Sequence, residues 1–258
     1  MKFKWIKTNL PPIQKICLAG LFMALAIILQ KVVAINYIPV LPFVRVSFCG
    51  PALIIFSSIL LGPIYGMLVG IGSDLLGYLF FDPRTYPPFL QITAIYAVLG
   101  FFSYFVFSFV YSIKNKKAML AIEIASLSAI WVAASLFLFL NDKVELVFKI
   151  VVPIVSGLLF IGLMLFSILY KGKEGEQLIS PLHICFASFV CDFLFLLLFG
   201  SLMKACAFGF ELFLTIFLCQ AIVMFANVML DTIFISTFLK FTKKYFVWSN
   251  QDGRRETE

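Results

Sequence analysis

Apolar stretches long enough to cross a membrane recur along this chain of 258 residues. A transmembrane helix needs roughly 20 predominantly apolar residues, and ordinary soluble domains lack such stretches. Backbone N–H and C=O groups surrounded by lipid must bond within the chain, so these stretches predict helices. The predicted spans cover residues 13–31, 51–61, 63–81, 89–112, 118–140, 145–170, 179–203 and 210–240.

The composition agrees with an all-α membrane protein of about eight helices, folded as a single membrane domain over residues 1–258. Hydrophobic residues make up 62% of the chain and charged residues 13%, against about 45–50% and about 25% in soluble domains. The net charge of +7 does not call for nucleic acid as a partner. Most Lys and Arg residues fall on the side of the termini, which predicts that both termini are cytoplasmic in a bacterial cell membrane.

Small residues recur every fourth position in the third span. Gly62, Gly66, Gly70 and Asp74 follow this spacing, and Gly77 comes three residues later, so they share one helix face. Glycine inside a helix costs about 1 kcal/mol relative to alanine, so several in register need a packing reason. The stripe predicts close approach of neighbouring helices, with Asp74 fixing that packing.

Three carboxylates lie inside predicted spans: Asp74, Asp192 and Asp231. Ionisable residues inside a membrane are costly and are functional candidates by default. Asp192 and Asp231 either line a cavity or face each other, and the sequence favours neither. A proton-coupled carrier that uses these carboxylates is therefore one alternative function.

Two connections predicted on the outer side carry arginine and aromatic residues. Arginine grips carboxylates with two hydrogen bonds and stacks on flat rings, so these connections suit an anionic, flat ligand. The alternative is that the arginines are solvated and the aromatics belong to the interfacial belt. The candidate binding residues are Arg45, Phe48, Arg84, Tyr86 and Phe89, followed by Gln91 and Thr93 at the start of the fourth span.

The motifs that most often mark enzymes and metal sites are missing from the sequence. No phosphate-binding GxxxxGK[ST] loop occurs, the single His has no Cys or carboxylate at metal-ligand spacing, and no Ser or Cys has an evident base. We therefore expect neither an enzyme nor a cofactor or metal site. Gly20 and Ala24 form a small-xxx-small pair, which is either an internal packing notch or a docking face for another subunit.

Four short runs, in this order and spacing, resemble the substrate-binding S components of energy-coupling factor (ECF) vitamin transporters. The folate subfamily is the most similar, and the likeness covers about residues 15–110. The runs are Arg45-Val-Ser-Phe48, Leu61-Gly-Pro-Ile-Tyr-Gly66, Ser73-Asp74-Leu-Leu-Gly77 and Tyr86-Pro-Pro-Phe89.

The resemblance implies a subunit that binds one vitamin from outside, here folate or a related pterin, under its outer loops. It implies a transmembrane coupling subunit and two cytoplasmic ATPases as partners, with Gly20 and Ala24 at the contact with the coupling subunit. Arg45, Tyr86 and Phe89 lie in matching motifs.

The chain also departs from the family pattern. S components usually have six helices, so residues 113–178 resemble an inserted two-helix hairpin. Helix 4 begins Leu90-Gln91-Ile92-Thr93, one residue off the family pattern, and the last two spans match only in general character. Riboflavin, thiamine or a queuosine precursor is therefore an alternative substrate, and a membrane assembly protein without substrate is a further alternative function.

Overall fold

The computed structural model describes the parts of the chain that form the bundle and a short terminal ribbon. The described residues are 6–8, 10–32, 50–81, 90–113, 115–140, 146–169, 180–242 and 246–248.

Seven of the described helical segments are long and apolar enough to cross a membrane. The eighth, α2, has 12 residues and spans only about 18 Å of a hydrocarbon core about 30 Å thick. The all-α membrane fold is therefore confirmed. The helical elements are α1 (Pro12–Ile27), η1 (Ile28–Val32), α2 (Gly50–Leu61), α3 (Pro63–Phe81), α4 (Leu90–Ser112), α5 (Lys116–Leu140), α6 (Leu146–Leu169), α7 (Pro181–Cys191), η2 (Asp192–Phe199), α8 (Gly200–Phe208), η3 (Phe210–Leu212) and α9 (Phe213–Thr242).

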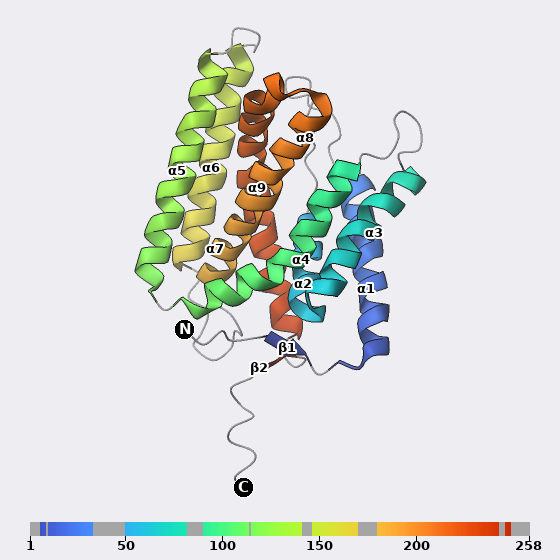
Figure 1. Ribbon diagram of the computed structural model, residues 1–258. Coiled ribbons are helices and arrows are strands. Elements are labelled where there is room, and N and C mark those ends of the chain that lie inside the picture. The colour runs from blue at the N-terminus through green and yellow to red at the C-terminus, as the bar shows by residue number, and fades with distance from the viewer. Residues whose placement is uncertain are drawn as a thin grey trace.

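The short helix α2 is the centre of the bundle. Every one of its residues is buried, because α1, α3, α4 and α9 all pack against it. Figure 1 shows α1, α3 and α4 on one side of the molecule and the α5–α6 pair on the other, with α7, α8 and α9 between them. An apolar helix that is hydrophobic on all sides belongs in such a place.

The two ends of the described chain meet in a small antiparallel ribbon that the sequence analysis did not predict. Strand β1 (Ile6–Thr8) pairs with β2 (Phe246–Trp248), with Lys7 opposite Val247. Beta-branched and aromatic residues favour such pairing. The ribbon places both ends at one end of the bundle, named here the ribbon end (Figure 1). The opposite end, where η1 and α3 finish and α2 and α4 begin, is named the distal end.

Helices α3 and α4 approach each other as closely as their backbones allow. A Cβ atom on Gly66 would come 2.5 Å from the Gly100 carbonyl oxygen, and one on Gly70 would run into the Tyr96 carbonyl oxygen. Gly100 in turn faces the backbone of Gly66. Both helices therefore need glycine at this crossing, as membrane helices in close contact often do.

Gly62 has a different role from the one that the stripe assigns to it. It lies before the first residue of α3, in the turn from α2, with φ of +105° and no atom within 4 Å of the place of a Cβ. Its backbone conformation, and not helix packing, requires glycine there.

Polar side-chain contacts connect α5 to two other helices, α6 and α7. Trp131 Nε1 donates to the Pro153 carbonyl oxygen and to Ser156 Oγ, both at 3.2 Å. The fully buried Glu123 of α5 accepts a hydrogen bond from Cys185 Sγ of α7 at 2.8 Å. These contacts join α5 to α6 and to the rest of the bundle. The assignment of residues 113–178 as an insertion stays a prediction.

Candidate functional site

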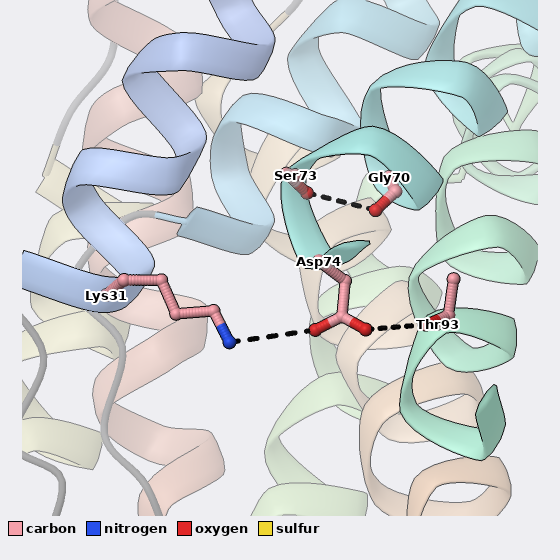
Figure 2. A network of polar contacts seen from close by, with 5 residues as sticks. All are labelled: Lys31, Gly70, Ser73, Asp74 and Thr93. Atoms are coloured by element: carbon pink, nitrogen blue, oxygen red, sulfur yellow. Dashed lines mark hydrogen bonds and ion pairs between the residues drawn. The ribbon is translucent and has the colours of Figure 1, made fainter. Parts of the chain in front are cut away.

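A polar network joins three helices near the distal end. Lys31 Nζ of η1 lies 3.8 Å from Asp74 Oδ1 of α3, and Thr93 Oγ1 of α4 donates to Asp74 Oδ2 at 2.6 Å. Figure 2 shows the carboxylate between the two partners. Only 9% of the Lys31 side chain and 12% of the Asp74 side chain are exposed. Opposite charges and a hydroxyl donor therefore satisfy each other inside the bundle.

The glycine face of α3 makes room for this network. A Cβ atom on Gly77 would come 2.9 Å from Lys31 Cε, so the missing side chain leaves space for the stem of the lysine. Directly before Asp74, Ser73 Oγ donates to the carbonyl oxygen of Gly70, which lies about one turn earlier, at 3.0 Å (Figure 2). Along this face of α3, close backbone packing at Gly66 and Gly70 is followed by the polar contacts of Asp74.

A second contact joins a residue of η1 to the first residue of α2, on either side of the segment 33–49. The Gln30 side chain is 3% exposed and lies directly over Gly50, where a Cβ would come 3.0 Å from Gln30 Cδ. The residues that precede and follow this segment are therefore held together. Likewise, the Asp74–Thr93 hydrogen bond joins the two helices that flank residues 82–89.

Five predicted binding residues belong to the two segments just named and lie outside the described residues: Arg45, Phe48, Arg84, Tyr86 and Phe89. Gln91 is half-buried in the first turn of α4. Thr93 was expected to orient a ligand, but its single hydroxyl proton goes to Asp74. A charged acceptor at this distance forms a strong hydrogen bond, so Thr93 joins helices in this structure.

Two residues of this region escaped the sequence analysis. Lys31 was not among the candidate residues, although a lysine in the last turn of a membrane helix is a usable signal. Gly100 stands alone in its span, and a single glycine gives no spacing pattern from which to predict a crossing.

A second polar cluster lies in the other half of the bundle, between α8 and α9. The Gln220 amide lies 2.9 Å from Ser201 Oγ. When its oxygen and nitrogen are placed so that both find partners, the nitrogen donates to the Leu196 carbonyl oxygen at 3.1 Å and the oxygen accepts from Lys204 Nζ. This cluster contains a cation and neutral groups.

The carboxyl groups of Asp192 and Asp231 face each other. They are 0% and 1% exposed and lie close enough to interact electrostatically. Both oxygens of Asp192 and Oδ2 of Asp231 have no hydrogen-bond partner in the described part of the chain. Two ionised carboxylates are acceptors only, so a hydrogen bond between this pair would require a proton on one of them.

The outer surface of α1 exposes the small residues that were singled out in the sequence. Gly20 and Ala24 are exposed, and no atom lies within 4 Å of the place of a Cβ on Gly20. Apolar side chains flank them, with Ile16 61% and Leu21 53% exposed. Gly20 is therefore not a packing notch for any described part of this chain. Among the described residues, no group of three His, Cys, Asp or Glu side chains is placed to hold a metal ion.

Comparison with known proteins gives one match. The model of the family described as ECF-type riboflavin transporter, S component, matches residues 12–159, which is more than half of the chain. No curated protein and no solved structure matches significantly. The matched range runs from α1 through α5 and into α6, so it holds all three helical elements that the Lys31–Asp74–Thr93 network joins. The chain belongs to the family of ECF-type riboflavin transporter S components and is a membrane-embedded, vitamin-binding transporter subunit.

Proposed function

We propose that this chain is the high-affinity riboflavin-binding subunit of an ATP-driven ECF importer. The observation that carries the substrate is the family match, because riboflavin is the vitamin that the family description names. The ligand would bind at the distal end, beneath the segments 33–49 and 82–89. Residues with arginine and aromatic side chains in these segments suit a flat, fused-ring ligand.

The polar network supports this placement. Lys31, Asp74 and Thr93 fix the ends of η1, α3 and α4 relative to one another. Residues 33–49 follow η1 in the chain, and residues 82–89 connect α3 to α4. A binding site is precise when rigid elements hold its loops. In this proposal the network positions the loops, and the loops contact the vitamin.

Folate or a related pterin is the second candidate ligand. The runs Arg45-Val-Ser-Phe48 and Tyr86-Pro-Pro-Phe89 favour it, because they are most similar to the folate subfamily. Both vitamins present a planar ring with hydrogen-bonding edges, so the aromatic residues suit either.

The partners follow from the same proposal: a transmembrane coupling subunit and two cytoplasmic ATPase subunits. The exposed small-residue surface at Gly20 and Ala24 would allow another helix to approach closely. Gly20→Leu and Ala24→Leu should abolish co-purification of the coupling subunit while vitamin binding persists. Loss of vitamin binding together with co-purification would contradict this assignment.

Titration of the purified chain tests the ligand. Riboflavin fluorescence should be quenched on binding in lipid nanodiscs, and folate should compete weakly or not at all. Tight folate binding without riboflavin binding would reverse the order of the two candidates. In vesicles that also contain the coupling subunit and ATPases, uptake should require ATP. Uptake driven by a proton gradient without those partners would overturn the proposal in favour of a carrier.

A further inference from the structure

Lys204 points its charge into the bundle. Ser201 and Ala205, on the same side of α8, are both 0% exposed, and Lys204 itself is half-buried. Its Nζ atom donates to the side-chain oxygen of Gln220. Lysines near helix ends usually extend toward the membrane surface, and this one turns toward a neighbouring helix.

The depth of Gln220 shows that the ammonium group is not at the helix end. Gln220 lies about two turns, or about 10 Å, inside the beginning of α9 at Phe213. The other partner of its amide is the carbonyl oxygen of Leu196 in η2, still farther from the end of α8. The charge of Lys204 therefore lies below the distal surface.

Lys204 has no counter-charge in the described part of the chain. No carboxylate oxygen there lies within 4.0 Å of its Nζ, whereas Lys31 has Asp74. An ammonium group has three donors, and the described residues provide one acceptor. Removing an unpaired charge from water is costly, so the site favours an additional anionic partner.

The cluster also lies next to the helix that begins at the candidate site. A Cβ atom on Gly200 would come 3.7 Å from the side-chain amide of Gln220 and 3.8 Å from Ile95 Cδ1 of α4. Ile95 follows Thr93 by two residues, so the first turns of α4 lie between the two lysine clusters. Lys204 of α8 thus lies next to the part of the distal end where α4 begins.

We propose that Lys204, supported by Gln220 and Ser201, binds a negatively charged group of the ligand, a phosphate or a carboxylate. This inference rests on the proposed function and narrows its ligand class. Within the flavins it selects the phosphorylated form, flavin mononucleotide (FMN), and within the pterins it selects folate, which carries carboxylates.

The test uses two pairs of ligands that share a ring and differ in charge: riboflavin with FMN, and pterin with folate. Each is titrated into the full chain in nanodiscs, as wild type and as Lys204→Gln. The wild type should prefer the charged member of the pair that it binds. Lys204→Gln should weaken that member by about ten- to a hundredfold, the range for a hydrogen bond to a charged group, and the neutral member by much less.

Lys149→Gln is the matched control, because Lys149 also lies in the distal half but donates to Phe139 in the α5–α6 pair. It should change neither affinity. Two results would overturn this inference: an equal loss of affinity for both members of the pair in Lys204→Gln, or a wild type that binds the neutral member more tightly. In either case, binding of riboflavin or pterin would still uphold the proposed function. The wild-type preference decides the matter even if the variant does not fold. Failure of all four ligands to bind wild-type protein would overturn the proposed function itself, and this inference with it.

Discussion

Two lysines lie inside the distal half of the bundle, and their surroundings differ in one respect. Lys31 faces Asp74, whose other oxygen accepts from Thr93. Lys204 faces the neutral amide of Gln220. The first cluster carries no net charge and joins three helices, while the second retains a positive charge and joins α8 to α9. The chain thus has one lysine that holds the scaffold together and one whose charge is left for a ligand.

This difference follows from where each lysine stands in the sequence. Lys31 ends a helix that packs against the glycine face of α3, where Asp74 takes the next position of the four-residue spacing after Gly66 and Gly70. Lys204 lies in α8, and no described carboxylate comes within ion-pair distance of its Nζ atom. If the interpretation is correct, removing a partner of Lys31 should cost stability, and removing Lys204 should cost ligand binding.

The largest effect is expected for Asp74→Ala. The change removes the carboxylate that faces the buried Lys31 charge, and breaking a buried ion pair in this way costs about 3–5 kcal/mol. The measurement is the unfolding free energy in detergent, followed by tryptophan fluorescence. The double variant Lys31→Met/Asp74→Leu should recover most of the loss, because it removes both charges of the pair. A single variant as stable as wild type would show that the pair does not hold the scaffold.

Thr93→Val should have a smaller effect in the same direction. It keeps the shape of the side chain and removes one donor to a carboxylate, which is typically worth about 1.5–3 kcal/mol. The same unfolding assay measures it. Ser112→Ala is a suitable control, since Ser112 Oγ donates within its own helix to the Phe109 carbonyl oxygen on the exposed surface. A loss no greater than that of the control would remove Thr93 from the network.

Lys204→Gln should change the unfolding free energy least, by less than about 0.5 kcal/mol or in the stabilising direction. The substitution removes the charge of the half-buried Lys204, which has no carboxylate partner among the described residues, and keeps a polar group beside Gln220. Replacing such a charge often costs little. The assay is run without ligand. A loss comparable to that of Asp74→Ala would mean that both lysines hold the scaffold, and the contrast between them would fail.

Local sequence signals predicted the positions of the helices well. They predicted the contacts between helices much less well. Residues 63–81 were predicted as a span and form α3 with the same bounds, because Pro63 suits a first helical turn. The span predicted at 179–203 instead continues to Phe208 through the π-helical turns of η2. Apolar composition does not reveal such a change of helix type.

The candidate site was predicted only in part, for a physical reason. The spacing of Gly66, Gly70 and Asp74 identified one face of one helix, but spacing within a helix does not say which residue lies opposite. Lys31 reaches Asp74 from η1, and no local pattern links these positions. The inward direction of Lys204 likewise depends on Gln220, which comes from a different helix.

The most direct test of the central claim is native mass spectrometry of the intact chain, purified from membranes in mild detergent without added ligand. The account predicts a protein peak with one additional mass that is released on activation and matches a flavin, or a folate as the second candidate. It also predicts that this mass becomes less abundant when the coupling subunit and ATPases turn over ATP in the same vesicles. A chain that carries no small molecule and takes up neither vitamin when they are supplied would contradict the assignment as a vitamin-binding subunit.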